Sequence, residues 1–352
     1  MSHTPIQIGL LGLGTVGSGV VKMLRQNRLD LLAKTGCSVD VKKILVRDLE
    51  KDRRVEVDPA LLTQDAWEIL HDPDVQVVVE VIGGEAEAKD YVLAALRQGK
   101  HVITANKDLI AVHHRELKRV ADEHGSLLLY EAAVAGAVPI VRTLKQSFAA
   151  DRIREVKGIV NGTTNFILSK MTGEGVSYAE ALEEAQELGY AEADPHADVS
   201  GLDAARKMAI LASLAFGKPV SLADVDVTGI AEVTQEDVEA AKARGEVLKL
   251  IGRAHEARDG HLEVTVAPTA LPAAHPLSQV GDCYNAVYVY GEALGEAMFY
   301  GRGAGEMPTA SAVVGDLYQV LCEIAPPVEK VAWGVPVQPP VAETAKSLEM
   351  RV

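Results

Sequence analysis

Apolar runs alternate with helix-periodic segments through the first part of the chain. The runs that predict strands lie at residues 6–11, 39–46, 75–84, 101–107 and 126–136. The run VQVVVEVIGG is almost wholly apolar, as expected for a strand of a parallel sheet with both faces covered. Helical patterns follow at residues 16–24 and 88–100. Strands that alternate with helices predict a doubly wound, Rossmann-type α/β domain.

The pattern changes after about residue 150. Residues 153–160 predict a strand, 161–165 a polar turn before a helix, and 234–254 a helix with a capping box at Thr234 and Asp237. Three more strands are expected, at residues 261–271, 285–292 and 295–303, and a glycine-rich turn then leads into a helix. This order of elements predicts a second domain of mixed α+β type.

We therefore place a dinucleotide-binding domain at residues 1–140, completed by about residues 303–352, and a catalytic domain at residues 141–302. The residues from about 326 onward carry several prolines and are expected to form a partly extended tail.

Three glycines follow the first strand with the spacing G-x-G-x-x-G. Gly12 would allow the tight turn, Gly14 would let the backbone approach a pyrophosphate, and Gly17 would let the helix pack on the strand. A glycine-rich turn without a ligand is the alternative. The position of the motif between a strand and a helix favours dinucleotide binding.

Charged residues at the end of the second strand bear on the choice of cofactor. An acid there would hold the ribose hydroxyls of NAD, and a base would hold the 2′-phosphate of NADP. Both are present, as Arg47 and Asp48, with more basic residues in 51–54. This favours NADP or the use of both cofactors, although residues 51–54 also fit a solvated loop.

Composition narrows the classes of function. The chain has 352 residues, 48% of them hydrophobic and 24% charged, which fits a globular protein of two domains. Its net charge of -15 and its lack of Lys/Arg runs argue against a nucleic-acid or anionic-membrane partner. No apolar run is long enough to span a bilayer, and a strand beginning at residue 6 leaves no room for a signal peptide. Cys37, Cys283 and Cys322 lack metal-ligand spacing, which favours a reducing cytoplasm.

An acidic cluster precedes a lysine in residues 189–217, where the carboxylates are Glu192, Asp194, Asp198 and Asp203. Lys207 lies four residues after Asp203, so both would share one face of a helix that begins near Gly201. Residues 208–216 are apolar on every side and predict a buried helix. The alternative to a functional lysine here is a surface Asp–Lys pair.

Lys107 is expected at the carboxyl end of a strand, the edge at which such sheets bind ligands. Hydride delivery to a carbonyl needs a nearby proton donor, which a lysine can be, and carboxylates suit an ammonium group. The residues thus predict a nicotinamide-dependent reductase for an amino-bearing small molecule. Gly303 and Gly305 fit either a cofactor contact or an ordinary loop.

Six stretches between about residues 6 and 320 resemble the homoserine dehydrogenase family, whose members interconvert L-aspartate 4-semialdehyde and L-homoserine. They read GLLGLGTVGSGV, VITANKDLIA, YEAAVAGAVPI, GIVNGTTNFIL, ELGYAEADPHADVSGLDAARK and GAGEMPTASAVVGDL. Ordinary Rossmann enzymes lack the pair NGTTNFIL and GLDAARK. The resemblance implies a cytoplasmic enzyme of threonine, methionine and isoleucine biosynthesis that uses NADP or NAD.

The resemblance also implies roles for single residues. Lys207 would donate and accept the proton at the substrate carbon, with Lys107 as the second catalytic lysine, and Glu192 and Asp203 would hold homoserine. The implied cofactor contacts, beside Gly12, Gly14 and Gly17, are Thr15, Val16, Arg47, Lys107, Gly189 and Gly303. A monovalent-cation site, suited to sodium, would comprise Glu131, Val134, Gly136 and Val138. The residues alone would favour a Glu131 satisfied by backbone amides.

Many members carry a regulatory ligand-binding domain after the catalytic part, and some are fused to aspartate kinase. This sequence shows neither, so feedback inhibition by threonine through such a domain is not expected. Strands of the second domain resemble the family's dimer-forming sheet, which implies a homodimer. Two other hypotheses stay open: a dehydrogenase for another amino-bearing substrate, and an NADP-binding regulator without catalysis.

Overall fold

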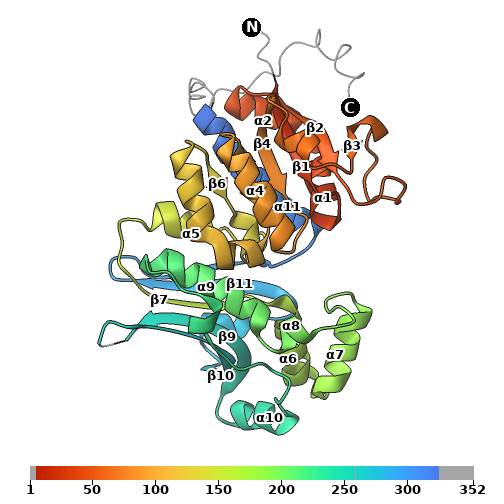
Figure 1. The fold of residues 1–352 in the computed structure, drawn as a ribbon. Coiled ribbons are helices and arrows are strands. Elements are labelled where there is room, and N and C mark those ends of the chain that lie inside the picture. Colours follow the sequence, from red (N-terminus) through yellow and green to blue (C-terminus); the bar gives the residue numbers. More distant parts are fainter. Residues whose placement is uncertain (1–4, 258, 325–352) are drawn as a thin grey trace. The chain divides into compact units, whose positions relative to one another are not determined.

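The computed structural model describes residues 5–257 and 259–324 (Figure 1). Within them, residues 5–104, 115–129 and 313–324 form one compact unit, and residues 105–114, 130–257 and 259–312 form another. The tail expected from about residue 326 lies outside the described residues.

A parallel sheet of six strands forms the centre of the first unit, in the order β3-β2-β1-β4-β5-β6. The strands are β1 (Ile6–Leu11), β2 (Val39–Leu45), β3 (Leu62–Thr63), β4 (Val75–Glu80), β5 (His101–Thr104) and β6 (Leu128–Leu129). The order reverses between β1 and β4, which is the strand order of dinucleotide-binding sheets. The Rossmann-type fold expected from the sequence is therefore confirmed.

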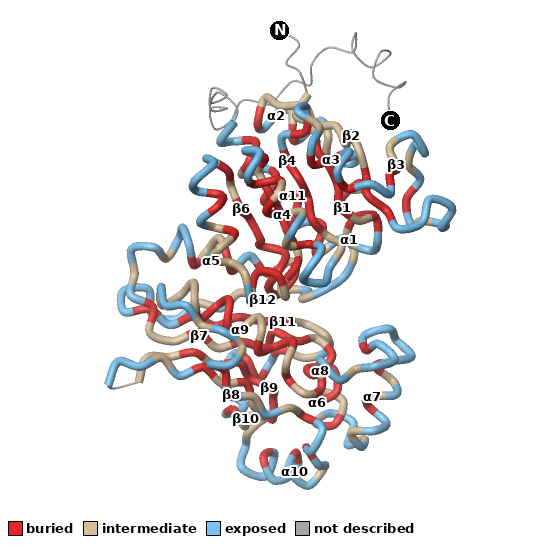
Figure 2. Tube along the Cα trace, viewed as in Figure 1, coloured by how far each residue is buried: buried red, intermediate tan, exposed pale blue. Residues whose placement is uncertain are grey.

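Helices flank this sheet: α1 (Thr15–Gln26), α2 (Arg28–Thr35), α3 (Trp67–Leu70), α4 (Ala86–Arg97) and parts of α5 (Lys107–Glu123) and α11 (Glu306–Ile324). Consecutive residues 77–80 of β4 are buried, although successive side chains point to opposite faces (Figure 2). Both faces of the sheet are therefore covered, as the unbroken apolar run predicted.

The second unit contains a mixed sheet in the order β12-β11-β7-β9-β10-β8. Its strands are β7 (Ile153–Ile159), β8 (Asp226–Val227), β9 (Glu246–Glu256), β10 (Leu262–Pro272), β11 (Tyr284–Gly291) and β12 (Gly295–Arg302). Helices α6 (Gly162–Glu174) and α9 (Leu202–Phe216) pack on it, beside the shorter α7 (Tyr178–Glu187), α8 (His196–Val199) and α10 (Gln235–Ala243). The α+β type of this domain is confirmed.

Several predicted elements begin or end elsewhere. The helix expected at 234–254 has the predicted capping box but stops at Ala243, and β9 follows. Gly245, with φ +74°, turns the chain, and β9 then gains hydrogen bonds from both β7 and β10. That pairing outweighs the helical propensity of the segment.

The other differences bear on the site. Only Leu128–Leu129 of the strand expected at 126–136 forms, and Glu131–Ala133 is a 3-10 turn. Lys107 is the first residue of α5 rather than the end of a strand. The turn expected at 161–165 is wrong, because the Asn161 side chain accepts a hydrogen bond from the Thr164 amide and starts α6 at Gly162. α9 has Gly201 as its N-cap, as expected, and is fully buried from Met208 to Ala212 but half-buried after that.

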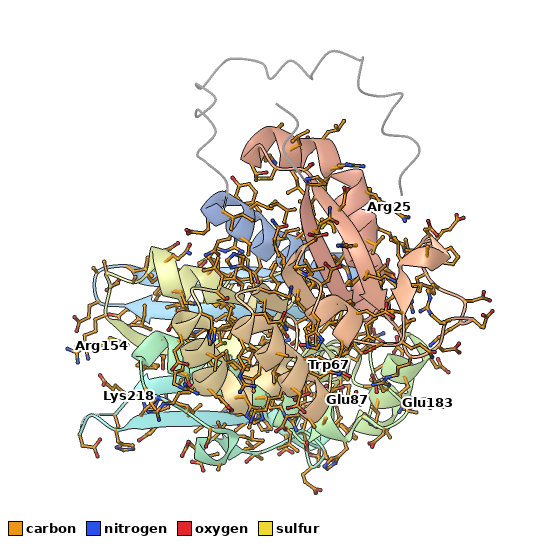
Figure 3. All side chains as sticks on the ribbon, turned by 45° about the horizontal axis from the view of Figure 1, so that its top comes forward. Arg25, Trp67, Glu87, Arg154, Glu183 and Lys218 are labelled. Atoms are coloured by element: carbon orange, nitrogen blue, oxygen red, sulfur yellow. The ribbon has the colours of Figure 1, made fainter. Side chains whose placement is uncertain are left out.

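Charged side chains such as Arg25, Glu183 and Lys218 lie at the periphery of the two units (Figure 3). Among the residues that the structure describes, none of the helices combines the length and the apolar character that crossing a membrane requires. The three cysteines are free thiols.

One lysine is buried inside the second unit without a carboxylate partner in the described part of the chain. Lys249 on β9 is 3% exposed, and its Nζ donates to Asn165 Oδ1 at 3.0 Å, Ser169 Oγ at 3.0 Å and the Val280 carbonyl at 2.7 Å. Burial lowers the pKa of Lys249 from 10.5 to about 8. The neutral partners supply hydrogen bonds but no compensating charge.

This pKa gives Lys249 a pH-dependent effect on stability. Between about pH 8 and 10.5 the folded chain has released the Lys249 proton while the unfolded chain still binds it. The free energy of unfolding therefore rises with pH in that window, by about 3 kcal/mol over its full width. We expect the stability of the native chain relative to Lys249→Met to increase across this range in urea titrations. A difference that stays constant with pH would contradict a depressed pKa.

Candidate active site

The glycine turn after β1 has the geometry that its motif predicts. Gly12 adopts φ +108°, and a Cβ there would lie 2.9 Å from the Val81 carbonyl oxygen. A Cβ at Gly17 would lie only 2.1 Å from the Gly12 carbonyl oxygen, so α1 packs tightly on the turn. A Cβ at Gly14 would meet nothing within 4 Å. The middle glycine therefore faces open space at the N-terminus of α1, where an anion is favoured.

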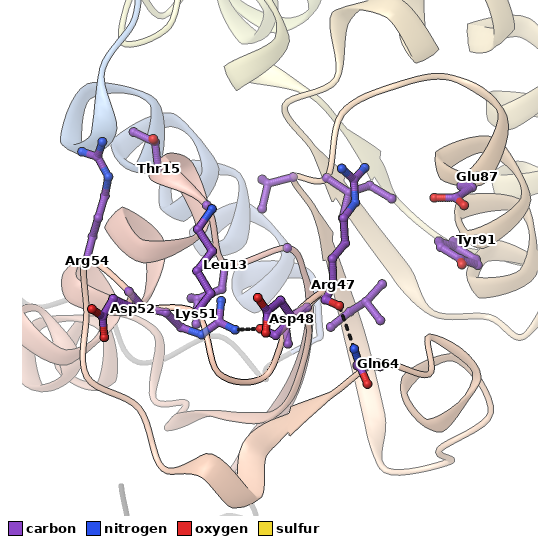
Figure 4. A pocket seen from close by; sticks show the side chains of 17 residues that line it. Leu13, Thr15, Arg47, Asp48, Lys51, Asp52, Arg54, Gln64, Glu87 and Tyr91 are labelled. Atoms are coloured by element: carbon purple, nitrogen blue, oxygen red, sulfur yellow. Dashed lines mark hydrogen bonds between the residues drawn. The ribbon is translucent and has the colours of Figure 1, made fainter.

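This turn borders a cavity of about 770 Å³ in the first unit (Figure 4). Thr15 and Arg47 line it, as the sequence predicted for cofactor contacts, whereas Val16 does not. Other charged lining residues are Asp48, Lys51, Asp52, Arg53, Arg54 and Glu87. An open backbone cradle beside four basic side chains fits the phosphates of a dinucleotide.

Glu80, at the end of β4, shapes the same cavity and was missed by the sequence analysis. It is fully buried; one carboxylate oxygen accepts a hydrogen bond from Thr104 Oγ1 at 2.5 Å, and the other accepts from the amides of Ile82 and Gly83 at 3.0 and 3.3 Å. It thus fixes the segment that carries Ile82 along the cavity wall. The sequence does contain a signal for this residue, because Glu80 is an acid inside an otherwise apolar strand.

The two predicted catalytic lysines meet on one carboxylate in the second unit. Lys207 Nζ lies 2.6 Å from Asp203 Oδ2, and Lys107 Nζ lies 3.3 Å from Asp203 Oδ1. Lys207 also donates to the Val160 carbonyl at 2.7 Å. Asn161 Nδ2 donates to Asp203 at 2.9 Å and to Asp198 at 2.7 Å. The acid–lysine cluster read from the sequence is thus a connected network.

The charges of this network are mutually dependent. Burial raises the pKa of the Asp203 carboxyl, but Lys207 and Lys107 outweigh burial and lower it to about 2. Burial lowers the pKa of Lys107, but Asp203 and Asp108 outweigh burial and raise it. Burial raises the pKa of Asp198. Near neutral pH, Asp203 is therefore a carboxylate and Lys107 an ammonium.

All of these groups line one cavity of about 850 Å³ within the second unit. Glu192 lies on its wall and is exposed. Gly189 and Gly303, predicted cofactor contacts, line it as well. A Cβ at Gly303 would lie 2.1 Å from the Asn285 side chain, so this position has no room for one. Arg206 also lines the cavity, and its Nε lies 3.0 Å from Asp108 Oδ1.

Glu131, predicted as a cation ligand, is 4% exposed. Its two carboxylate oxygens accept hydrogen bonds from the Val141 and Arg142 amides, each at 2.8 Å. The other predicted ligands are Val134, Gly136 and Val138, and the chain between Val134 and Val138 passes through Ala135 and Gly136, both at φ 54°. The amide contacts match the alternative that the residues alone favoured for Glu131, and a cation ligand set remains a prediction.

Asn161 is the residue of the cluster whose role the sequence analysis missed. It is 4% exposed, caps α6 and bridges Asp198 and Asp203. An asparagine directly after a strand and before Gly162 is a helix N-cap signal, which could have marked it.

Comparison with known proteins agrees with this geometry. Residues 139–318 match the model of the homoserine dehydrogenase family, and residues 12–131 match the model of the homoserine dehydrogenase NAD-binding domain. The chain belongs to the homoserine dehydrogenase family. It is an oxidoreductase with homoserine dehydrogenase function, and neither alternative hypothesis from the sequence is favoured. The NAD-binding match also supports a cofactor of the NAD(P) class.

Individual relatives cover most of the chain. The homoserine dehydrogenase of Bacillus subtilis is 56% identical over 317 residues, which are 90% of this chain and 73% of that protein. The crystal structure of a homoserine dehydrogenase from Thiobacillus denitrificans superposes with a TM-score of 0.87 at 42% identity, over 93% of this chain and 76% of that one. The structure of a hyperthermophilic archaeal homoserine dehydrogenase in complex with NADPH superposes with a TM-score of 0.75 at 27% identity. The match covers 92% of this chain and 100% of that one.

The different surroundings of two glycines in the dinucleotide turn yield a matched pair of variants. Gly17→Ala places a methyl group on the Gly12 carbonyl, so we expect a loss of about 1–3 kcal/mol in the free energy of unfolding. Gly14→Ala places it in open space and should change stability by less than about 0.5 kcal/mol. It should nevertheless weaken NADPH binding about tenfold or more, because the backbone can no longer approach the pyrophosphate.

Urea unfolding and NADPH fluorescence titration measure the two effects separately. Native NADPH affinity in Gly14→Ala would show that the pyrophosphate does not approach this turn.

Proposed function

We propose that Lys207 transfers the proton in the interconversion of L-homoserine and L-aspartate 4-semialdehyde, in the cavity of the second unit. The observation that carries the proposal is the single buried carboxylate, Asp203, that holds both lysine side chains. Lys207 is held by Asp203 and the Val160 carbonyl, so its Nζ has a fixed position on the cavity wall. A positioned amine next to a reacting hydroxyl is the requirement for general acid–base catalysis.

The other groups complete the set of roles. A nicotinamide cofactor, when bound, would supply the hydride acceptor for the alcohol carbon and the hydride donor for the aldehyde carbon. Lys207 takes or gives the hydroxyl proton, and the Lys107 ammonium stabilises negative charge that develops on the substrate oxygen. Glu192 and Asp203 are carboxylates suited to the substrate ammonium. Glu192 is exposed on the cavity wall, so a bound ammonium can reach it.

For the cofactor, we propose NADP in preference to NAD. Arg47 at the end of β2 and the basic side chains at 51, 53 and 54 line the cavity beside the glycine turn. These basic side chains suit the 2′-phosphate of NADP. Asp48 and Asp52 line the same cavity and suit the ribose hydroxyls of NAD, so NAD stays an alternative. We keep as a proposal the division expected from the sequence, with a dinucleotide-binding domain at residues 1–140 and about 303–352 and a catalytic and dimerisation domain at 141–302. The compact units differ from it, because residues 105–114, 130–140 and 303–312 group with the second unit.

A sodium ion bound by Glu131 and the carbonyls of Val134, Gly136 and Val138 remains part of the proposal. Its support is the buried carboxylate and the two residues of positive φ that turn the intervening backbone. All four groups are hard oxygen ligands.

We also propose a homodimer in the cytoplasm. β12 lies at the edge of the second sheet, and its side chains alternate between half-buried and exposed. Met298 and Tyr300 are 39% and 53% exposed on one side of it, and Tyr290 on neighbouring β11 is 42% exposed. A sheet edge with exposed aromatic and methionine side chains suits association with a second copy. The free thiols are compatible with a reducing compartment.

The role of Lys207 is tested by oxidation of L-homoserine with NADP or NAD, followed at the absorbance band of the reduced nicotinamide. We expect Lys207→Ala to lower kcat by about 10²-fold or more, because the proton acceptor is lost. Lys218→Ala, an exposed lysine paired with Glu256, should behave like the native chain. The oxidation rates with NADP and with NAD show which of the two cofactors the enzyme prefers. A Lys207→Ala variant with native turnover would exclude the role, and a native chain inactive with both cofactors would exclude the function.

The dimer is tested by size-exclusion chromatography with light scattering. We expect a mass of twice the 37.5 kDa of one chain. The double variant Met298→Asp/Tyr300→Asp should shift the mass toward that of one chain, because buried unpaired carboxylates oppose association. Asp substitutions at the exposed Leu29 and Val112, which lie on α2 and α5 and not in this sheet, are the control. A native chain that is monomeric at micromolar concentration would overturn the proposal.

A further inference from the structure

One buried amide joins the first turn of α6 to a loop of the second unit. Asn165 is 1% exposed. Its Nδ2 donates to four carbonyl oxygens of the loop at residues 280–284: those of Val280 at 3.2 Å, Gly281 at 3.3 Å, Asp282 at 2.9 Å and Tyr284 at 3.1 Å. Two amide hydrogens shared among four acceptors hold the loop wrapped around this side chain.

The loop forms part of the wall of the cavity that contains Lys107 and Lys207. Cys283 and the following Asn285 both line that cavity, as does Gly162 at the start of α6. A Cβ at Gly162 would lie 2.6 Å from the Cys283 carbonyl oxygen, so loop and helix are in close backbone contact. Asp282 adopts φ +54°, a conformation that is strained for a residue with a side chain. The surrounding contacts must therefore impose the shape of the loop.

Lys249 determines which way the Asn165 amide faces. An ammonium group donates hydrogen bonds and accepts none, so the group beside it must be the amide oxygen. Lys249 Nζ lies 3.0 Å from Asn165 Oδ1, and the NH₂ group consequently faces the loop carbonyls. Lys249 also donates directly to the Val280 carbonyl at 2.7 Å. Burial of an ammonium without a carboxylate is costly, and well-packed apolar residues would serve stability alone at least as well.

We propose that Asn165 and Lys249 are positioning residues for the substrate. They hold residues 280–284 against the start of α6 and thereby set the wall of the cavity in which homoserine binds. The proposal rests on the proposed function, since it assigns the homoserine site to that cavity. Neither side chain lines the cavity, so both act through the loop and not by touching substrate.

Two variants separate positioning from folding. Asn165→Leu/Lys249→Met replaces the buried polar pair by apolar side chains of similar volume. Asn165→Asp keeps a hydrogen-bond acceptor for Lys249, but it removes both amide hydrogens and turns a carboxylate oxygen toward the loop carbonyls. Lys170→Met is the matched control, since Lys170 lies on the same helix and pairs at the surface with Glu174 and Glu184.

The measurements are Tm, the KM for L-homoserine and for NADP, and the rise in Tm that L-homoserine causes. We expect both variants to raise the KM for homoserine about tenfold or more and to shrink that rise in Tm, with the KM for NADP changed less than about twofold. The control should match the native chain. A variant that only lowers Tm, or that only lowers kcat, does not match this expectation and counts against the positioning role.

A folded variant of either kind with a native KM for homoserine would overturn the positioning role. If the double variant does not fold, Asn165→Asp alone decides the question in the same way. If the native enzyme does not oxidise L-homoserine and L-homoserine does not raise its Tm, the proposed function itself is wrong. That result is distinct from an active native enzyme whose variants keep a native KM.

Discussion

The cavity of the second unit depends on one carboxylate that holds two lysine side chains. Asp203 is nearly fully buried, and each of its carboxylate oxygens faces a different lysine. Without it, Lys107 and Lys207 would face each other on one partly desolvated cavity wall with no carboxylate between them. With it, both lysines are held in place and the carboxylate stays ionised.

The backbone supports the same arrangement. Lys107 opens α5, Asn161 caps α6, and Asp203 lies in the first turn of α9. Three helix N-termini thus contribute to this cavity, and the positive end of a helix dipole stabilises carboxylates. The first unit uses helix geometry differently. There the backbone of one glycine turn, rather than a set of side chains, provides the place for an anion.

Sequence reasoning was strongest where a local rule and the tertiary structure agree. The glycine turn, the order of strands and helices in the first unit, and the pair Asp203–Lys207 all follow from short-range spacing. It failed where partners distant in sequence decide. The sequence of β9 predicts a helix, but its pairing with β7 and β10 makes it a strand. The role of Asn161 depends on Asp198 and Asp203, which lie 37 and 42 residues away. Glu131 is a mixed case: the residues alone favoured its contacts with backbone amides, but it lies in a turn that the sequence predicted as a strand.

The grouping of residues into two compact units has an evolutionary consequence. Every side chain of the acid–lysine network belongs to residues 105–114 or 130–312, whereas the basic residues near the glycine turn belong to residues 1–104. Under the proposed function, residues 47–54 choose the dinucleotide, and none of them belongs to the unit that holds Asp203. Selection for a different cofactor and selection for the amino-acid substrate would therefore act on separate sets of residues.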